Sequence, residues 1–355
     1  MFSYQDINPI SIEKFRGVNS RGTIFQPGLK SCNKAIVNAD GDLLFVSSGN
    51  EIYGYNLFTE CCFRIYTGHD AIIEDFDVDS KSNNLVSVGM AGTVFIHEIE
   101  TGNVLLTIPV GHLLRCCCIS PLNSMVAVVT STQMKQEPVL HVYHFTQNGK
   151  SNEKTTFTFE RGINSIMYIS DNQIVCGDVD GKLLLVDTGE GKKGPSIAKT
   201  VNAHRGPINV IRKSWDGRFF ATASADTTAC TWETESFEKL GTFPHSFLVS
   251  SVAISPIANH IVLASSADKK NVASTNFGST DFTINFFNLI FQDEFASMKV
   301  FKSPVNDVVF TPDGMTLIAT SQEGTFMIIR LGDEYYQQCK ALKNEEEELE
   351  KETRQ

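Results

Sequence analysis

The sequence contains no run of about 20 consecutive apolar residues, the length that a helix needs to cross a bilayer. Residues 1–20, MFSYQDINPISIEKFRGVNS, also lack the apolar core of a signal peptide and the composition of a transit peptide. Positive charge is scarce, because 30 Lys and Arg face 41 Asp and Glu, and the formal net charge is -11. Since nucleic-acid binding depends on basic patches, we expect a cytoplasmic protein that binds neither a membrane nor nucleic acid directly.

The cysteines do not follow a disulfide or zinc pattern. There are nine of them, an odd number, and the neighbours Cys61 and Cys62 have no CxxC partner. In the triplet CCC at 116–118, successive side chains of a strand would point to opposite faces. The chain is 42% hydrophobic and only 20% charged, so it can bury a large core, and we expect reduced and mostly buried thiols.

A small residue followed by histidine recurs along the chain. The pairs are Gly68-His69, Gly111-His112, Ala203-His204 and Pro244-His245. The intervals between their histidines are 43, 92 and 41 residues. The interval of 92 residues spans two repeats, because one copy of the pair has lost its histidine near residues 161–162. Each period contains short β-rich runs separated by turn signals, such as PINVIRKSWDG, RFFATASAD, TTACTWETES and EKLGTFPHS. Four strands in a period of about 44 residues are typical of a WD40 β-propeller blade.

The sequence therefore predicts an all-β fold, a seven-bladed WD40 β-propeller with a short C-terminal helix. Residues 21–331 form the propeller, because 311 residues divide into seven repeats better than into six or eight. An open ring would expose unpaired strand edges, so we expect residues 21–27, RGTIFQP, to complete the last blade beside GTFMIIRL. The first strands of the blades are expected near Lys34, Glu74, Leu114, Ile163, Ile208, Val249 and Val305.

The two ends lie outside this repeat. Residues 1–20 form an N-terminal extension, either flexible or covering one face. Residues 332–355 form an acidic helix or tail that starts near residue 334, since Asp333 is a suitable N-cap and Tyr335, Cys339 and Leu342 have helical spacing. The four glutamates at 345–348 repel one another, so this end is either a solvated tip or a helix that docks.

One blade carries a full set of hydrogen-bonding residues in the order expected for a WD40 repeat. His204, Ser224 or Thr222, Asp226 and Trp232 have the spacing of a chain that fixes the outer strand to the inner ones. Such a network satisfies buried polar groups, so we interpret these residues as structural and not catalytic. The second blade keeps His69 but has Ala91 and His97 in place of the aspartate and the tryptophan.

Other candidates for chemistry are weaker. Asp75, Asp77 and Asp79 have calcium-loop spacing, but the glycine and the bidentate glutamate are missing. His141 and His144 lie on opposite faces of a strand and cannot chelate one ion together. The basic, glycine-rich residues 187–196 lack the Gly-Lys-Ser/Thr sequence that ends a P-loop, so they are expected to form a loop between blades. We therefore expect no metal, no cofactor and no enzymatic activity.

The sixth blade carries the most specific signal. Its strand-to-strand turn is long, and the sequence resumes with FTINFFNLIFQDEFASMKVFKSPVNDVVFTPDG. This arrangement resembles the i subunit of eukaryotic translation initiation factor 3, and the likeness also includes NADGDLLFVSS, YTGHDAIIEDFDVDS and SADTTACTW. The matching positions of the sixth-blade segment are Phe286, Phe287, Phe291, Asp293, Glu294, Phe295, Pro304 and Asn306.

The resemblance implies a non-catalytic scaffold that joins initiation factor 3 and contacts the small ribosomal subunit indirectly. A helix of the b subunit would lie across blades five and six, a segment of the g subunit would bind as well, and the propeller would not form a homo-oligomer by itself. The residues expected at the partner site are Asn209, Val210, Asp226 and Lys269. Val210 stands where the family usually has an acidic residue, so part of this contact is expected to be apolar. A related WD40 adaptor of a signalling or RNP-assembly complex is the alternative.

Overall fold

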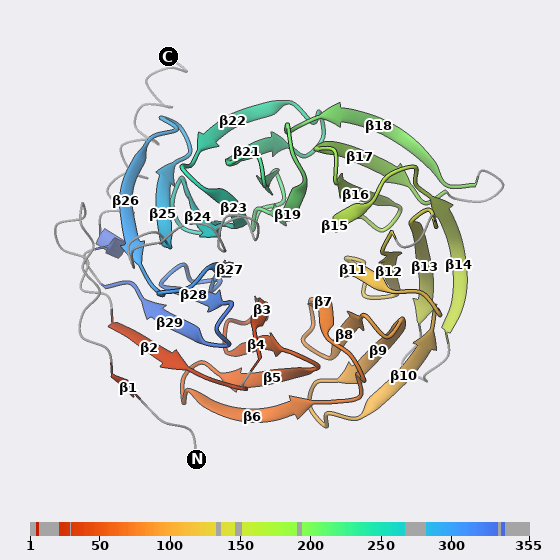
Figure 1. Ribbon diagram of the computed structural model, residues 1–355, viewed down its shortest axis with the longest axis horizontal. Coiled ribbons are helices and arrows are strands. Elements are labelled where there is room, and N and C mark those ends of the chain that lie inside the picture. The colour runs from red at the N-terminus through yellow and green to blue at the C-terminus, as the bar shows by residue number, and fades with distance from the viewer. Residues whose placement is uncertain are drawn as a thin grey trace, which may run out of the picture.

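The computed structural model describes residues 5–6, 21–28, 30–132, 136–145, 151–189, 194–266, 282–332 and 335–337. In this part of the chain the strands form seven antiparallel sheets around a central axis, as Figure 1 shows. In each sheet one edge strand lies at the axis and the opposite edge lies on the rim. The predicted seven-bladed propeller is therefore confirmed.

The first three blades follow one another along the chain. Blade 1 contains β3 (Cys32–Val37), β4 (Leu43–Ser48), β5 (Glu51–Asn56) and β6 (Cys61–Tyr66). Blade 2 contains β7 (Ile73–Val78), β8 (Asn84–Gly89), β9 (Thr93–Glu98) and β10 (Val104–Pro109). Blade 3 contains β11 (Leu114–Ile119), β12 (Met125–Thr130), β13 (Val139–Phe145) and β14 (Ser151–Thr158).

The next three blades have the same order of strands. Blade 4 contains β15 (Ile163–Ser170), β16 (Gln173–Asp178), β17 (Lys182–Asp187) and β18 (Ser196–Asn202). Blade 5 contains β19 (Ile208–Lys213), β20 (Phe219–Ser224), β21 (Thr228–Glu233) and β22 (Lys239–Pro244). Blade 6 contains β23 (Leu248–Ile254), β24 (His260–Ser266), β25 (Thr283–Asn288) and β26 (Glu294–Lys299).

Blade 7 joins the two ends of the chain. It contains β27 (Val305–Phe310), β28 (Thr316–Ser321) and β29 (Phe326–Arg330), and its outer strand is β2 (Arg21–Phe25). The pairing runs from Arg21 opposite Arg330 to Phe25 opposite Phe326, so the predicted closure of the ring is confirmed. β1 (Gln5–Asp6) pairs with the outer side of β2 and adds a fifth strand, which the sequence did not predict.

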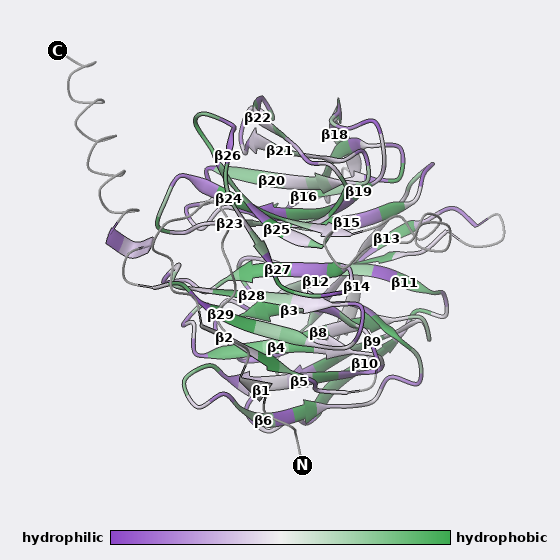
Figure 2. Cartoon of the chain, turned by 60° about the vertical axis from the view of Figure 1, so that its left-hand side comes forward, coloured by the Kyte–Doolittle hydropathy of each residue, from purple (hydrophilic) through white to green (hydrophobic). Residues whose placement is uncertain are grey.

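The apolar core lies between the blades. Seven clusters of buried apolar residues occur in the described residues, and each joins two neighbouring blades. The cluster between blades 4 and 5, for example, packs Val175 and Leu183 against Ile208, Phe220 and Trp232. Apolar residues accordingly concentrate on the strands, and many of the turns that join them are polar (Figure 2). Each blade is stabilised by burying both of its faces against its neighbours.

The end of the described chain touches the propeller. Residues 335–337 form one helical turn, and Tyr335 is only 2% exposed. Its hydroxyl shares a hydrogen bond of 2.5 Å with Nε2 of His260, at the start of β24. The remaining residues of the expected C-terminal helix lie outside the described part of the chain.

Two further observations concern expectations from the sequence. Residues 187–196 connect β17 to β18, and these two strands pair within blade 4. The expectation of a loop between blades is therefore wrong. Within the described residues, no helix is long and apolar enough to span a bilayer.

Candidate functional site

A β-bulge occurs near the start of the first strand of every blade. In β19, for instance, Ile208 pairs with Ser224 and Val210 pairs with Ala223, which leaves Asn209 without a partner residue on β20. A bulge turns the extra side chain away from the regular alternation. The same shift is present in β3, β7, β11, β15, β23 and β27.

In blades 5, 6 and 7, the bulged side chain joins its own blade to the next. Asn209 Nδ2 of blade 5 donates to the Val249 carbonyl of blade 6 at 2.8 Å. Ser250 Oγ of blade 6 donates to the Val305 carbonyl of blade 7 at 2.6 Å, and Asn306 Nδ2 donates to the Cys32 carbonyl of blade 1 at 2.9 Å. These bonds satisfy carbonyl groups near the channel and fix the position of each blade relative to the next.

Asp307 lies beside them and connects four blades. Its carboxylate accepts from Arg212 Nη2 of blade 5 at 2.9 and 2.8 Å, and from Ser251 Oγ of blade 6 at 2.5 Å. It also accepts from the Ala35 backbone N–H of blade 1 at 3.0 Å. The buried carboxylate therefore helps to close the ring, together with the Asn306 bond and the β2–β29 pairing. No sequence pattern indicates this residue, because its partners Arg212 and Ala35 are 95 and 272 positions away.

The mouth of the channel is a small polar cavity. It has a volume of about 150 Å³, and its lining includes Lys34, Arg115, Asn209, Val210 and Arg212. The Lys34 ammonium is 2.6 Å from Asp75, and Arg115 pairs with Glu74. The charges at this mouth are thus paired with one another across neighbouring blades.

The hydrogen-bonded chain of blade 5 runs from Trp232 to Asp226. Trp232 Nε1 donates to Thr222 Oγ1 at 3.0 Å, and Thr222 Oγ1 lies 2.7 Å from His204 Nε2. His204 Nδ1 lies 3.1 Å from Asp226 Oδ2, which can only accept, so Nδ1 carries the proton and Nε2 accepts from Thr222. The middle position is filled by Thr222 and not by Ser224.

Ser224, at the end of β20, supports the same network by bonding the backbone beside His204 and Asp226. Its hydroxyl donates to the Gly206 carbonyl at 3.1 Å and accepts from the Asp226 backbone N–H at 3.1 Å. Lys239 of β22 covers the Trp232 ring, with Nζ 4.9 Å from the ring centroid. The network therefore connects β20, β21, β22 and the segment before β19.

The carboxylate of Asp226 is almost fully used inside the blade. Besides His204, it accepts from the Arg205 backbone N–H at 2.8 Å, the Thr228 backbone N–H at 3.0 Å and the Thr228 hydroxyl at 2.7 Å. Burial opposes ionisation of Asp226, but these hydrogen bonds outweigh it and hold the carboxyl pKa below its usual value. Burial lowers the pKa of His204 more than Asp226 raises it, so the pair is a neutral imidazole beside a carboxylate.

Blade 2 contains a reduced version of this chain. His69 Nε2 lies 2.8 Å from Ser87 Oγ, but His97 Nε2 donates to the Thr67 carbonyl at 2.9 Å and does not join the serine. The missing aspartate leaves Nδ1 of His69 buried without a hydrogen bond to the described residues. Blade 2 is therefore held less completely than blade 5.

The expected partner-site residues that the structure describes lie together. Asn209 and Val210 are at the start of β19, Asp226 follows the end of β20, and these ends are adjacent because Ile208 pairs with Ser224. We call this side of the propeller the top face; it carries the turns between the second and third strands of each blade. Lys269 lies outside the described residues.

The residues of the sixth-blade segment have different environments. Phe286 and Phe287 of β25 are buried, and the Phe287 ring packs edge-on against Phe243 of blade 5 at 5.9 Å. Phe291, in the turn between β25 and β26, is 76% exposed. Asn306 makes the blade 7 to blade 1 contact described above. Only part of this segment is therefore available to a partner.

The acidic residues with calcium-loop spacing serve other contacts. Asp75 bonds Lys34 and the Cys117 backbone N–H, and Asp77 accepts from the Ile119 backbone N–H at 2.8 Å. Among the described residues, no three His, Cys, Asp or Glu side chains are grouped so that they could hold a metal ion.

Comparison with known proteins agrees with this architecture. The family model described as "WD domain, G-beta repeat" matches residues 196–233 and 295–329. The β-propeller domain of Cps50 (Swd1) from Myceliophteria thermophila superposes with a TM-score of 0.71 over 86% of this chain and 98% of that one. Its sequence identity of 14% supports the fold alone.

Curated relatives are more informative. Eukaryotic translation initiation factor 3 subunit I of Drosophila willistoni is 30% identical over 316 residues, which cover 87% of this chain and 97% of the relative. The subunit of the same name from Drosophila melanogaster is 29% identical over 325 residues, 89% of this chain and 98% of the relative. The likeness thus extends over nearly the whole length of these relatives. The chain belongs to the family of eukaryotic translation initiation factor 3 subunit I.

Proposed function

We propose that this propeller is a non-catalytic scaffold subunit of initiation factor 3, which binds a helix of the b subunit and a segment of the g subunit. Its role is to support assembly of the factor on the small ribosomal subunit. The observation that carries this proposal is family membership over nearly the full length of the relatives. The helix site is supported by the position of Asn209, Val210 and Asp226 at one end of blade 5, next to the joint with blade 6.

The internal bonds of Asp226 limit how it can serve a partner. Its side chain is 12% exposed, and three backbone or hydroxyl donors and one histidine already occupy it. An Asp226→Lys variant would break the blade as well as the contact, so a loss of binding would be ambiguous. Val210 is a better test position, because it lies at the channel mouth on the same face and makes no polar bond.

The direct test compares opposite charges at position 210. Val210→Asp restores the acidic residue that the family usually has and should tighten binding of the b-subunit helix about fivefold if that helix is basic, whereas Val210→Lys should weaken it about fivefold. Glu323→Lys, in the turn between β28 and β29 on the same face of blade 7, is the control and should leave binding unchanged. Binding is measured by calorimetry with a recombinant C-terminal fragment of the b subunit. Equal affinities for all three variants would contradict the site.

The complex itself is tested by purifying the tagged protein from its own cells at moderate salt. The b and g subunits should copurify, and a portion should sediment with the small ribosomal subunit. Recovery with kinases or an unrelated RNP, with no ribosomal fraction, would contradict the scaffold function and favour the adaptor class.

A further inference from the structure

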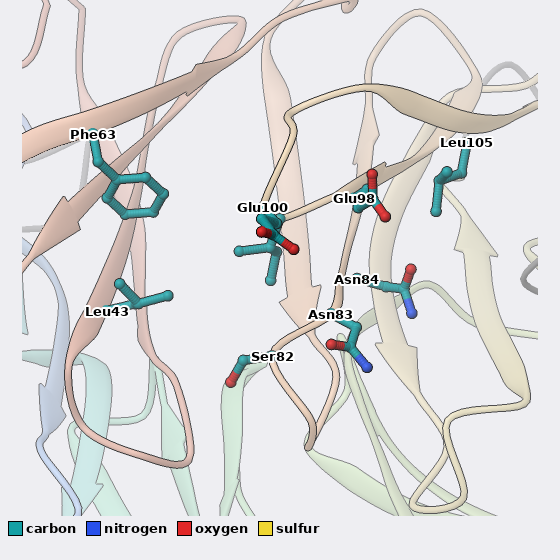
Figure 3. Close-up of a pocket in the computed structure, with 9 residues that line it drawn as sticks. Leu43, Phe63, Ser82, Asn83, Asn84, Glu98, Glu100 and Leu105 are labelled. Carbon is teal, nitrogen blue, oxygen red and sulfur yellow. The ribbon is translucent and has the colours of Figure 1, made fainter.

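A cleft lies between blades 1 and 2, on the side of the propeller opposite the top face. Its volume is about 550 Å³. Figure 3 shows the side chains that surround it: Leu43 and Phe63 of blade 1 and, from blade 2, Ser82, Asn83, Asn84, Glu98, Ile99, Glu100 and Leu105. Nothing in the network or the channel uses these residues.

The strand order places this cleft away from the proposed helix site. Asn84 begins β8, the second strand of blade 2, whereas Asp226 follows the end of β20, the second strand of blade 5. Because all blades have the same strand order and direction around the axis, the start and the end of the second strand lie on opposite faces. A ligand in this cleft would leave the top face accessible.

Hydrogen bonds between the two blades hold the cleft open. Tyr66 Oη of blade 1 donates to the Ile99 carbonyl of blade 2 at 2.9 Å, and Arg64 Nη2 donates to the Glu100 carbonyl at 2.7 Å. Asn38 Nδ2 donates to Ser82 Oγ at 3.2 Å. The walls are therefore fixed in advance, which lowers the entropy that a ligand loses when it binds.

Phe63 provides a rigid apolar surface in the cleft. One side of its ring rests on Gly54, where a Cβ atom would come within 2.7 Å of the ring. The ring also packs edge-to-face with Phe45, and the two ring centroids are 6.3 Å apart. The side chain nevertheless remains 38% exposed. Leu43 and Leu105 are half-buried beside the same space, and Ile99 is buried. An apolar side chain that enters would bury surface without displacing any of these residues.

The rim of the cleft is acidic. Glu98 and Glu100 point toward it from the end of β9 and the following turn, and neither carboxylate has an ion-pair partner within the described residues. Within the described residues, the Glu98 carboxylate accepts one hydrogen bond, from the Thr101 hydroxyl at 2.5 Å. The neighbouring cation Arg64 donates to the backbone carbonyl of Glu100 and, within the described residues, forms no ion pair with either carboxylate. A ligand with positive charge beside an apolar group therefore complements this surface.

We propose that this cleft binds a segment of a partner protein in which a Phe or Leu side chain is flanked by Lys or Arg. The apolar side chain lies against Phe63, Leu43 and Leu105, and the flanking cations pair with Glu98 and Glu100. The site is additional to the b-subunit and g-subunit contacts proposed above and does not depend on them, because it was inferred from the geometry and charge of the cleft alone.

The probe is a fluorescein-labelled peptide, Gly-Ser-Gly-Lys-Phe-Arg-Gly-Ser-Gly, whose binding to the full chain is followed by fluorescence polarisation. A control peptide carries Glu in place of both cations. The basic peptide should bind at least tenfold more tightly than the acidic one, and binding should weaken as salt is added. No binding of the basic peptide, or equal binding of both peptides, would overturn the proposal.

Variants and a crosslink locate the site. The double variant Glu98→Gln with Glu100→Gln removes the charge at nearly constant shape and should weaken the basic peptide about tenfold, whereas Glu323→Gln, on the top face, should not. A second peptide with benzoylphenylalanine in place of Phe should crosslink to β6 or to residues 98–105, as mapped by mass spectrometry. Crosslinks on other blades, or an unchanged affinity of the double variant, would refute the assignment.

Discussion

The carboxylate of Asp307 should be among the most sensitive positions of the ring. Replacing it with alanine removes the partner of Arg212, whose side chain is 24% exposed, and leaves the Ser251 hydroxyl and the Ala35 backbone N–H without an acceptor. Removing one partner of a buried ion pair lowers the free energy of unfolding by about 3 to 5 kcal/mol. We use the lower value, about 3 kcal/mol, because Arg212 is partly exposed. Each of these two abandoned donors adds about 1 kcal/mol, so we expect Asp307→Ala to cost roughly 5 kcal/mol.

Replacing Arg212 should lower the free energy of unfolding less than replacing Asp307. After Arg212→Met, Asp307 still accepts from Ser251, Ala35 and its neighbour Val308, so its charge stays hydrogen-bonded. We expect this variant to cost about 2 kcal/mol, and the double variant to cost less than the sum of the two single variants by at least about 1 kcal/mol. The structure thus predicts an asymmetry that a simple ion pair would not give.

The assay is thermal unfolding followed by intrinsic fluorescence, with urea unfolding as a second measurement. At roughly 2 °C per kcal/mol for a chain of this size, Asp307→Ala should lower Tm by about 10 °C. The matched control is Asp180→Ala, which removes one side of the exposed pair with Arg161, 3.1 Å apart, and should cost under about 1 kcal/mol. If Asp307→Ala and Asp180→Ala lower Tm equally, the reasoning is refuted.

Two further predictions concern the buried histidines and the blade 5 network. Burial lowers the pKa of both His69 and His260 to about 4 from 6.5, so the stability they contribute is complete above pH 6.5 and decreases as the pH falls toward 4, by about 3 kcal/mol for each. Urea titrations between pH 7 and 4 measure this, and a His260→Gln variant with an unchanged acid dependence would contradict it for that residue. Thr222→Val leaves Trp232 Nε1 and His204 Nε2 unpaired and should cost about 3 kcal/mol, whereas Ser224→Ala, the control on the same strand, should cost about 1 kcal/mol in the same thermal assay. Equal losses for the two would mean that Thr222 is not the central member.

The architecture was predictable because it repeats. The spacing of the histidine pairs and the four β-rich runs in each period predicted seven blades. The need to pair the free strand edge predicted that residues 21–27 complete blade 7, and residues 21–25 do pair with β29. Both features follow from local patterns or from a requirement of the fold as a whole. A repeat signal of this kind is present in the sequence however far apart the contacting residues are.

The details that depend on unique side-chain contacts were not predictable. Ser224 and Thr222 both suit the middle of the network. They are two positions apart in β20 and so share one face of the strand, and only their position along β20 decides that Thr222 contacts His204 while Ser224 contacts Gly206. Among the described residues, the pair of Arg212 and Asp307 is the one ion pair that skips a blade, so this bridge has no repeat signal. The contact between Tyr335 and His260 was equally absent from the patterns, because it joins the end of the chain to a position 75 residues earlier.

The pairing of β2 with β29 has a consequence for the order in which the protein can be made. The strand at residues 21–25 leaves the ribosome early, but its partner at residues 326–330 is synthesised about 300 residues later. At about 5 to 20 residues per second, the early strand waits roughly 15 to 60 s with an unpaired edge. The bulged-residue bonds and apolar clusters between consecutive blades can form during this time, whereas the joint between blades 7 and 1 cannot. A nascent chain of this protein therefore passes through an open arc of blades, and this arc is the form that most needs protection from aggregation during synthesis.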